Sequence, residues 1–546
     1  MPVEEQFGVW DYSVFFSMLL ASSGIGIYYA FTSARKPLAP KSMGVVPVAM
    51  SLISTSLSPV AMLGIPAEMY FFGIQFIVIQ LGLLVTVLLT NHVYMPMFYN
   101  LDVTSAFQYL ELRFNRTLRT ICSVSSTLQM VVYMAIVLYG PALALQQVTG
   151  VNLWLSVLSI GAVCTFYTSI GGIKAIVMAD VFMSFIKYAS IVLLAVKGTL
   201  DVGGPDVIFQ KNLDTGRLQL LDFRPDPTIR HSVWAMVIGG TFLWLTLYAV
   251  NQSWVQRYLS MPSIQAVRRQ VNPTLALWVN LVGVVVLQSL LCYVGLVIFA
   301  AYSDCDPVST KQVTAADQVR AVLIAHVRRR EEGIPSPTYP SILLKSCALI
   351  GVTRSCKRLS FFKVIFLCSR SKSLDKVSRG NVCLGVLGEP VVFGVIVVVM
   401  VYVAQQMGDV LQAALSVLGI VGGPLVGVFT LGIFVPFASA LGAIVGMITA
   451  MATLSWITVG AYIRRPMHPR PSVFVDGCTD LYFNVTGVEH ATLPTVDVDA
   501  HNFQIEYIYR LSYLWYSLLG VIIVLLLGSI ISVLTGKSFF FLFHHS

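Results

Sequence analysis

The residues best suited to chemistry lie in the apolar stretch 41–73, KSMGVVPVAMSLISTSLSPVAMLGIPAEMYFFG, which is long enough to cross a bilayer. Proline removes a backbone donor and clashes with the preceding turn, so Pro59 and Pro66 should loosen a helix and leave carbonyl groups free at mid-membrane. Free carbonyls beside hydroxyls suit a small hard cation such as Na⁺. A kinked packing helix explains the same residues, because neighbouring helices can satisfy the freed groups. The hydroxyls belong to Ser51, Ser54, Thr55, Ser56 and Ser58.

The composition of the chain places it in a bilayer. Of its 546 residues, 56% are hydrophobic and 11% are charged, whereas soluble domains carry about 25% charged residues. The net charge of +9 would suit nucleic acid, but Lys and Arg gather in short segments between apolar runs, as the positive-inside rule expects. The acidic start of the chain lacks the basic region of a cleavable signal peptide. We therefore predict a polytopic membrane protein whose partner is the lipid bilayer and not nucleic acid.

Apolar segments of spanning length alternate with short connectors along the chain. Every second connector is basic, at 35–41, 113–119, 174 and 257–269, which predicts that these connectors face the cytoplasm and that the N-terminus is extracellular. We expect a multi-pass protein of the plasma membrane. The twelve segments are 11–31, 44–70, 72–96, 120–147, 151–171, 177–199, 233–255, 272–302, 385–406, 409–435, 437–462 and 510–535.

The predicted orientation leaves one crossing unaccounted for. The NVT sequon at Asn484 must be outside to be glycosylated, and counting back from it places the start of segment 385–406 in the cytoplasm. Segment 272–302, however, should end outside, so a crossing is missing between 303 and 385. The residues there insert poorly, because Arg354 to Arg379 hold eight Lys or Arg against one acid. Arginines at 464, 465 and 470 favour the opposite orientation, but a long loop counts less in this rule.

The sequence contains no pattern of an enzyme or a metal site. It has no GxSxG, P-loop, HExxH or paired carboxylate framework, so we predict neither catalysis nor ATP use. Its nine cysteines show no zinc spacing, and we expect no cofactor. Cys305 and Cys478 lie in polar segments and would pair if both face outside. Uphill transport would have to draw on an ion gradient.

Five stretches follow one another along the chain: SLISTSLSPVAMLGIPAEMY (51–70), YLELRFNRTLR (109–119), GGIKAIVMADVF (171–182), LYAVNQSWVQRYLS (247–260) and AQQMGDVLQAALSVLGIVGGPLVGVFTLGIFVP (404–436). In this order they resemble the first core helix, a cytoplasmic loop, the start of the sixth helix, the NQ-x-x-x-QR signature and the late glycine-rich signature of the sodium/solute symporter family. The first and fourth stretches are most similar to the branch of monocarboxylate, multivitamin and iodide transporters.

The resemblance implies an all-α polytopic membrane protein with a leucine-transporter-like fold, in which inverted five-helix repeats carry extra flanking helices and one core helix is missing or replaced. Substrate and Na⁺ would be held where the first helix of each repeat is broken. In the second repeat Gly239 and Gly240 would interrupt segment 233–255, although close helix packing explains them equally well. By the same resemblance, Ser54 and Leu57 would offer backbone carbonyls to Na⁺.

Several polar and aromatic residues are candidate site residues. Asp180 matches an acidic position of the family on the inner sodium path, and Lys187 lies two turns further along nearly the same face. An ionisable residue within a span is functional by default, but one near the end can simply reach water. The candidate substrate ligands beside the two interruptions are Thr55, Ser58, Trp244, Thr246 and Tyr248.

Four further polar residues are expected near the two ends of the broken segments. Glu68 is expected to anchor the external vestibule. Asn251, Gln252 and Gln256 would either line an exit path or bond to neighbouring helices, and Gln256 beside Arg257 is also assigned to a cytoplasmic gate.

The resemblance divides the chain into three parts. Residues 1–320 form the symporter core, and residues 385–540 form the remaining transmembrane helices with an extracellular loop near 464–508. Between them the family has a Ser/Thr-rich helix that supplies hydroxyl ligands to sodium. The anomalous basic segment 321–384 stands in its place, which leaves Ser54 and Leu57 without those partners.

We expect a sodium-coupled secondary active symporter that imports a small organic anion, monocarboxylate or vitamin-like, by alternating access. Its partners would be Na⁺ and the anionic solute. Iodide or another small anion is an alternative substrate, and a passive channel of the same fold is an alternative function. A non-transporting or misannotated product lacking the sodium site, as a retained intron would give, is a further alternative.

Overall fold

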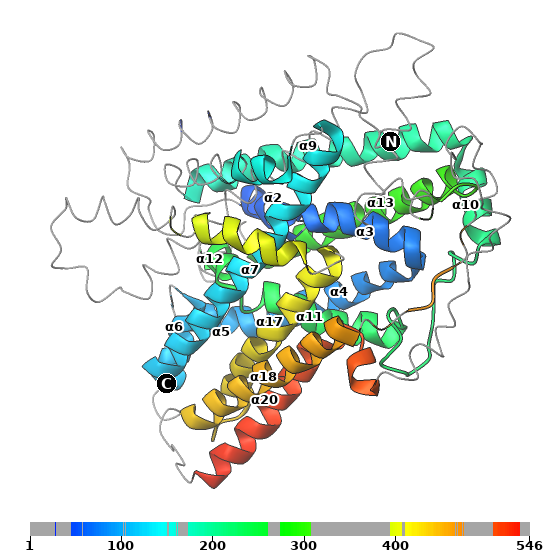
Figure 1. Ribbon diagram of the computed structural model, residues 1–546. Coiled ribbons are helices and arrows are strands. Elements are labelled where there is room, and N and C mark those ends of the chain that lie inside the picture. Colours follow the sequence, from blue (N-terminus) through cyan, green and yellow to red (C-terminus); the bar gives the residue numbers. More distant parts are fainter. Residues whose placement is uncertain are drawn as a thin grey trace.

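The regular elements in the described part of the chain are all helices. The computed structural model describes residues 45–149, 152–161, 173–259, 273–306, 394–406, 410–471 and 506–535, apart from isolated positions. Every α-helical, 3-10 or π element in these ranges is part of one bundle (Figure 1), in which α9 (Ile173–Val202) lies at one side and α18 (Ala440–Arg464) packs beside α20 (Trp515–Leu534) at the other. The predicted all-α class is confirmed.

Most of the predicted spans appear as long apolar helices. Among the described residues, six helices are long and apolar enough to cross a membrane, and a bent pair forms a seventh such span. Segment 321–384 and most of segments 11–31 and 151–171 lie outside the described residues. The six are Ile74–Asn100, Arg116–Gly140, Thr274–Ala301, Val410–Phe434, Ala440–Arg464 and Trp515–Leu534.

The bent pair is the predicted loosened helix. It consists of α2 (Val45–Ser56) and α3 (Pro59–Phe72), and the chain bends by 52° between them. Ser58 adopts extended backbone and its Oγ accepts a hydrogen bond from the Ala61 amide at 3.4 Å, while Pro59 begins α3, where a helix needs no amide donor. Pro66 lies inside α3 without ending it. The break is therefore confirmed, and only the first of the two prolines marks it.

The second interrupted segment breaks later than the sequence predicts. A π-helical turn, η3 (Ala235–Gly239), runs directly into α11 (Gly240–Tyr248), and the chain leaves the helix only before α12 (Gln252–Leu259). A Cβ at Gly239 would lie 2.7 Å from the Leu514 carbonyl oxygen, and one at Gly240 would lie 2.8 Å from Ile79 Cγ1. The two glycines therefore permit close helix packing. Of the two interpretations of these glycines, close helix packing is the one observed.

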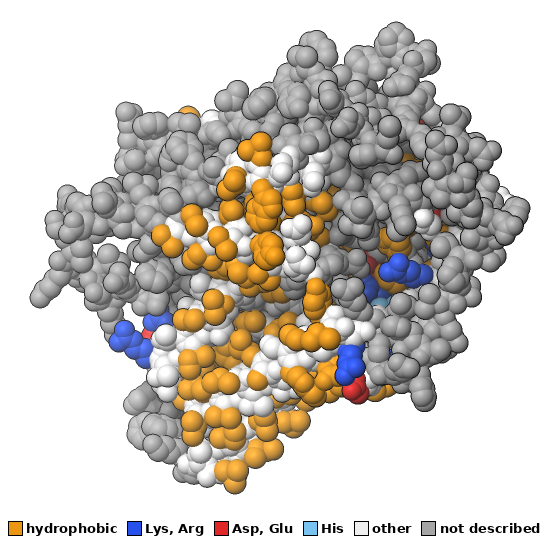
Figure 2. All heavy atoms as spheres, in the orientation of Figure 1, with side chains coloured by type: hydrophobic (Ala, Val, Ile, Leu, Met, Phe, Trp, Pro, Cys, Tyr) orange, Lys and Arg blue, Asp and Glu red, His pale blue; other side chains and the backbone are white. Residues whose placement is uncertain are grey.

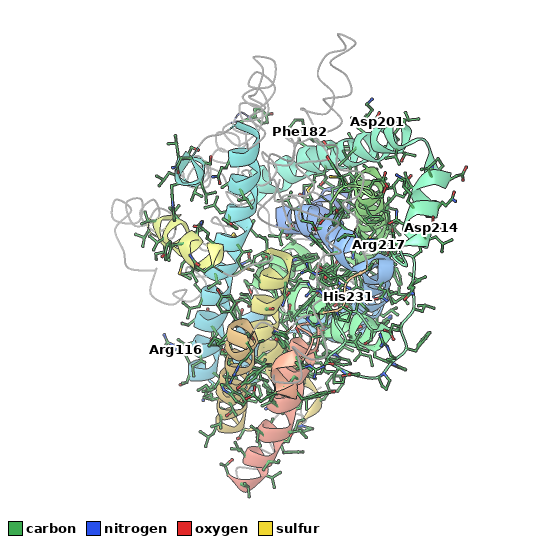
Figure 3. The ribbon with its side chains drawn as sticks, turned by 45° about the vertical axis from the view of Figure 1, so that its right-hand side comes forward. Arg116, Phe182, Asp201, Asp214, Arg217 and His231 are labelled. Carbon is green, nitrogen blue, oxygen red and sulfur yellow. The ribbon has the colours of Figure 1, made fainter. Side chains whose placement is uncertain are left out.

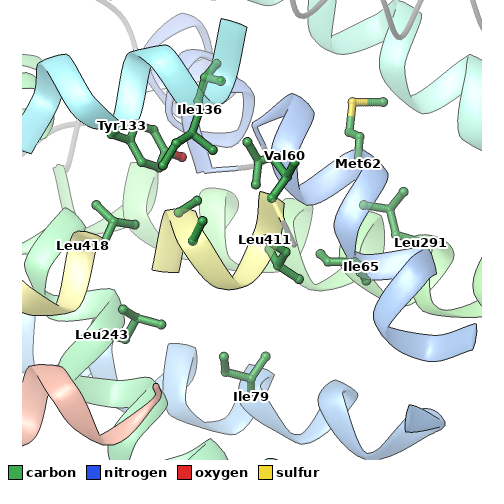
Figure 4. Packing of buried hydrophobic residues seen from close by; sticks show 14 of the residues in the cluster. Val60, Met62, Ile65, Ile79, Tyr133, Ile136, Leu243, Leu291, Leu411 and Leu418 are labelled. Atoms are coloured by element: carbon green, nitrogen blue, oxygen red, sulfur yellow. The ribbon is translucent and has the colours of Figure 1, made fainter. Parts of the chain in front are cut away.

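A single apolar core holds the broken helix in place. Helix α13 (Pro273–Ala301) packs against α2, α3 and α9, while α17 (Val410–Phe434) packs against α3, α7 (Arg116–Thr149) and α11. Figure 4 shows Val60 and Ile65 of α3 near Leu411 of α17, with Ile136 of α7 close by. The helix that follows the break is thus packed between elements from distant parts of the sequence.

The late glycine-rich stretch brings α17 against α20. A Cβ at Gly423 would lie 2.6 Å from the Ser517 carbonyl oxygen, and one at Gly427 would lie 2.8 Å from Val524 Cβ. Small residues let the backbones of membrane helices approach closely, and this contact supplies packing where lipid gives no hydrophobic driving force.

The outer faces of α18 and α20 are apolar. Large hydrophobic side chains gather on the part of the surface that these helices form in Figure 2. Such a continuous apolar face suits contact with lipid chains. The exposed residues on it include Leu441, Ile448, Trp456, Leu526 and Ile530.

Candidate functional site

The end of α2 presents buried oxygen atoms in the middle of the bundle. Its last turn has no following helical turn to satisfy its carbonyl groups, because the chain breaks after Ser56. Two hydroxyls bond back within the helix: Thr55 Oγ1 donates to the Ser51 carbonyl at 2.7 Å and Ser56 Oγ donates to the Leu52 carbonyl at 2.9 Å. Ser54 is also buried. This end of the helix carries the partial negative charge of its dipole and favours a cation.

Two cationic side chains from other helices reach this turn. Lys187 of α9 donates from Nζ to the Ser54 carbonyl at 3.1 Å and to Ser54 Oγ at 2.9 Å. Arg257 of α12 donates to the Ser51 carbonyl at 3.2 Å and to Thr55 Oγ1. Both side chains are buried, with Lys187 only 1% exposed. The freed Ser54 carbonyl, together with the nearby Ser51 carbonyl and Thr55 hydroxyl, is therefore bonded to positive charge supplied by the protein itself.

A tyrosine connects the break to two further helices. Tyr248, the last residue of α11, donates to Asn280 Oδ1 of α13 at 2.7 Å, and its hydroxyl lies 3.4 Å from Ser56 Oγ. The Trp254 ring lies against Tyr248, with ring centroids 4.2 Å apart. The end of α11 and the end of α2 are thus joined through buried polar and aromatic contacts.

The predicted substrate ligands do not all meet at one point. Thr55, Ser58 and Tyr248 lie at the break, where Ser58 also caps α3. Thr246 Oγ1 donates to the Leu243 carbonyl at 2.7 Å. The Thr246 side chain packs against Gly422 of α17, where an added Cβ would lie 2.6 Å from Thr246 Cβ. Thr246 therefore serves helix packing between α11 and α17 in this conformation.

Trp244 differs from the other predicted ligands because its donor is unused. Its ring packs edge-on against Tyr248, with centroids 6.1 Å apart. The indole Nε1 is buried and has no hydrogen-bond partner among the described residues. A buried donor of this kind is costly to leave unmatched, which makes it suited to an acceptor from a bound solute.

The predicted sodium residues are only partly placed. Ser54 lies in the last turn of α2, and its carbonyl is bonded as described above. Asp180 lies in α9, but its side chain, like Leu57 as a whole, is outside the described residues. Asn484 and Cys478 also lie outside them. Cys305 is disulfide-bonded, while its partner is not among the described residues, so the pairing with Cys478 stays a prediction.

Glu68 belongs to a buried charged cluster at the far end of α3. Arg230 donates to its carboxylate from Nε at 2.6 Å and from Nη2 at 3.2 Å, and His231 Nε2 lies 2.8 Å from the same carboxylate. Arg230 Nη1 also donates to Gln412 of α17 at 2.9 Å. The cluster ties α3 to α17 through the loop before η3. Sequence reasoning predicted an anchoring role for Glu68 but missed its partners, Arg230 and His231. The available signal was that these two residues stand directly before an apolar segment.

A second polar contact lies on the same side of the molecule. Arg217 Nε donates to the Tyr70 carbonyl at 3.0 Å, and its guanidinium lies over the Phe299 ring at 3.5 Å. Figure 3 shows Arg217 and His231 on the side of α10 (Pro205–Asp214), whereas Arg116, the first residue of α7, lies across the bundle. Gly73 ends α3 with φ 83°, and a Cβ there would lie 2.6 Å from the Arg217 carbonyl oxygen.

Asn251 and Gln252 bond within the protein. Asn251 Oδ1 accepts from the Ser253 amide at 2.9 Å and thereby caps α12. Gln252 Oε1 accepts from Ser105 Oγ at 3.1 Å and from the Ala106 amide at 2.8 Å, at the start of α6 (Ala106–Arg113). Gln252 thus bonds to the start of the neighbouring helix α6, whereas Asn251 bonds within its own helix.

A bundle of apolar helices in which two segments are interrupted around buried polar groups is the architecture of a secondary transporter. The chain belongs to the sodium:solute symporter family, whose model matches residues 37–330. It is thus a multi-pass membrane protein of a transporter family and not an enzyme.

Curated relatives and a solved structure agree with this family. The chain is 38% identical to sodium-coupled monocarboxylate transporter 1 of Homo sapiens over 97% of its own length and 88% of the relative. It is 36% identical to the sodium-dependent multivitamin transporter of Oryctolagus cuniculus (98% and 84% covered) and 34% identical to the sodium/iodide cotransporter of Homo sapiens (97% and 84% covered). The fold is similar to that of a Na⁺-coupled sialic acid symporter in a substrate-bound outward-open state, with a TM-score of 0.71, 22% identity, and 97% and 98% of the two chains covered.

Proposed function

We propose that this chain is a sodium-coupled secondary active transporter that imports a small organic anion, a monocarboxylate or a vitamin-like acid, across the plasma membrane. The observation that carries this proposal is the break between α2 and α3, where buried hydroxyls and carbonyls lie beside the interrupted end of α11. Relatives named for sodium-coupled transport of monocarboxylates and vitamins support the same conclusion.

The charges around the break favour a negatively charged solute. Lys187 and Arg257 bring two positive groups to the last turn of α2, and both are buried. Attraction between opposite charges is strengthened where water is excluded. Trp244 adds an unused indole donor that a carboxylate oxygen would accept. Thr55, Ser58 and Tyr248 complete the proposed substrate contacts, while Thr246 would need to leave its packing role to join them.

Na⁺ would be a second substrate of the cycle. In this proposal the Ser54 and Leu57 carbonyls bind it, and Asp180 lies on its inner path. One positive charge moving inward gains about 2.3 kcal/mol for each 100 mV of membrane potential, which drives uphill uptake of an anion when more than one Na⁺ moves with it. The breaks after α2 and after α11 are the points where the two interrupted segments bend during alternating access.

Uptake in cells expressing the chain tests the proposal. Labelled lactate, butyrate, nicotinate, biotin and iodide are offered separately, in sodium medium and in choline medium of equal ionic strength. We expect uptake of at least one carboxylate in sodium medium and none above background in choline. Iodide as the only substrate would change the substrate class, uptake that follows voltage without accumulation would identify a channel, and a surface-expressed chain that moves none of them would be a non-transporting product.

A further inference from the structure

We infer that the ammonium group of Lys187 is a built-in cation that competes with Na⁺ for the oxygens of Ser54 at the end of α2. This inference deepens the proposed function and rests on it. The atom to which Lys187 donates, the carbonyl oxygen of Ser54, is the same atom that the proposed function assigns to Na⁺.

The position of Lys187 is fixed by its neighbours on α9. One turn earlier, Ser184 Oγ donates to the Met50 carbonyl of α2 at 3.3 Å. The next residue, Tyr188, donates to the Gly283 carbonyl of α13 at 2.6 Å. These two contacts hold α9 against both helices and direct the Lys187 side chain toward the end of α2. The contact with Ser54 therefore belongs to the packing of three helices.

The chemistry of the contact matches that of a cation site. Lys187 is 1% exposed and Ser54 is 2% exposed, so the ammonium has lost nearly all contact with bulk solvent. A buried charge is tolerated only where it gains hydrogen bonds or an opposite charge. The Ser54 carbonyl, the Ser54 hydroxyl and the negative end of the α2 dipole supply these interactions. They are also the kind of oxygen ligand that a hard metal cation takes.

Two cations cannot share these oxygens without strong repulsion. An ion bonded to the Ser54 carbonyl would lie a few ångströms from the ammonium, and water would screen little of their repulsion there. Arg257 donates to the Ser51 carbonyl one turn earlier and to Thr55 Oγ1 next to Ser54, so it adds a second positive charge beside the same oxygens. Binding of Na⁺ therefore requires Lys187 to leave Ser54, and the lysine weakens the affinity for Na⁺.

The test measures Na⁺ binding directly and not through transport. The full chain is purified in nanodiscs, and its thermal unfolding is followed as NaCl replaces choline chloride at constant ionic strength. Lys187→Met removes the charge at similar volume, Lys187→Gln removes it but keeps a donor, and Lys187→Arg retains it. Lys197→Met, at the half-buried Lys197–Asp201 pair further along α9, is the matched control.

We expect the sodium concentration for half-maximal stabilisation to fall at least tenfold in Lys187→Met and in Lys187→Gln. Lys187→Arg and Lys197→Met should leave it at or above the wild-type value. The inference is overturned if either uncharged variant elutes as a monodisperse protein and binds Na⁺ within twofold of wild type, or if no variant binds Na⁺.

Uptake measurements on the same variants separate this inference from the proposed function. If wild type shows no sodium-dependent uptake but Lys187→Met gains Na⁺ binding, the competition stands and sodium coupling of this chain fails. If wild type transports with sodium and Lys187→Met has unchanged Na⁺ affinity, the proposed function stands and the competition is refuted.

Discussion

Replacing Arg230 with methionine is expected to destabilise the protein by about 3–5 kcal/mol. Arg230 forms two hydrogen bonds to the Glu68 carboxylate, at 2.6 and 3.2 Å, and both side chains are buried. Methionine keeps much of the apolar volume, so the main loss is the charge partner of Glu68. The carboxylate would then remain buried beside His231 alone, and an uncompensated buried charge is what makes such a truncation costly.

A double-mutant cycle isolates the interaction between the two groups. Unfolding of purified protein in mixed micelles, driven by added denaturing detergent and followed by tryptophan fluorescence, gives the free energies for wild type, Arg230→Met, Glu68→Gln and the double variant. We expect the double variant to be less damaged than the sum of the single variants, with a coupling energy of about 2–3 kcal/mol. Because Gln412 loses its bond to Arg230 as well, a part of the loss stays in the double variant.

The ion pair of exposed Arg224 and half-buried Asp222 provides the control. It has the same chemistry, with Arg224 Nη2 2.6 Å from Asp222 Oδ2, but the Arg224 side chain is 72% exposed. Arg224→Met should cost less than about 1 kcal/mol, because water screens an exposed ion pair. A cost for Arg230→Met no larger than that for Arg224→Met would refute the reasoning, because it would mean that burial adds nothing to the interaction.

Three further predictions follow from single contacts. Trp244→Phe keeps the ring against Tyr248 and removes the unused indole donor, so KM for the anion should rise about tenfold with surface expression unchanged; an unchanged KM would remove Trp244 from the site. Gly423→Ala should destabilise the protein by about 1–3 kcal/mol, because the new methyl would lie 2.6 Å from the Ser517 carbonyl oxygen, and a variant as stable as wild type in the same unfolding assay would contradict this packing. Burial lowers the pKa of His231 below 6.5, although Glu68 acts in the opposite direction. Below pH 6.5 the unfolded chain therefore binds a proton at His231 that the folded chain does not bind, and the protein loses stability as the pH falls. His231→Gln should flatten that slope between pH 7 and 5, by up to about 1.4 kcal/mol per pH unit, and an identical slope in the variant would contradict this cause.

The broken helix was predictable because its signals are local. Apolar length sets the span, and Ser58 before Pro59 is a start signal that works within one turn of helix. Pro66 carries the same residue type but lies inside α3, where surrounding packing holds the helix together. Proline itself does not distinguish the two positions: the Ser58 cap marks the first, and the continuation of the helix through Pro66 depends on the packing around α3.

The sequence left two interpretations of Gly239 and Gly240 in segment 233–255 for a related reason. Glycine both weakens a helix and lets helices approach closely, and sequence does not say which effect operates. Leu514 and Ile79 occupy the space that side chains at Gly239 and Gly240 would fill. The actual break, after Tyr248, falls within the NQ-x-x-x-QR signature, where Asn251 caps the next helix.

The cations at the break could not be found from sequence. Lys187 and Arg257 are far from Ser54 along the chain, and only the folded packing of α9 and α12 brings them to α2. The only signal in the sequence was that Asp180 and Lys187 lie on nearly the same face of one helix. This signal predicted an ion path but did not say which other helix Lys187 contacts. Contacts between distant helices depend on tertiary packing, which local patterns do not encode.

The basic segment 321–384 lies outside the described residues, and its replacement of a Ser/Thr-rich helix stays a prediction. Sequencing the mature transcript across residues 307–390 tests it. A Ser/Thr-rich spanning helix in the transcript would identify the basic stretch as an artefact, whereas a translated basic stretch would favour the non-transporting product.

The most direct test of sodium-coupled anion import uses purified protein in proteoliposomes. A sodium gradient directed inward, or a choline gradient of the same size, is imposed together with a potential that is negative inside, and the internal concentration of the labelled carboxylate is followed. We predict that the carboxylate rises above its external concentration only with the sodium gradient. Equal uptake with choline, or uptake that stops when the two concentrations are equal, would contradict sodium coupling for this chain.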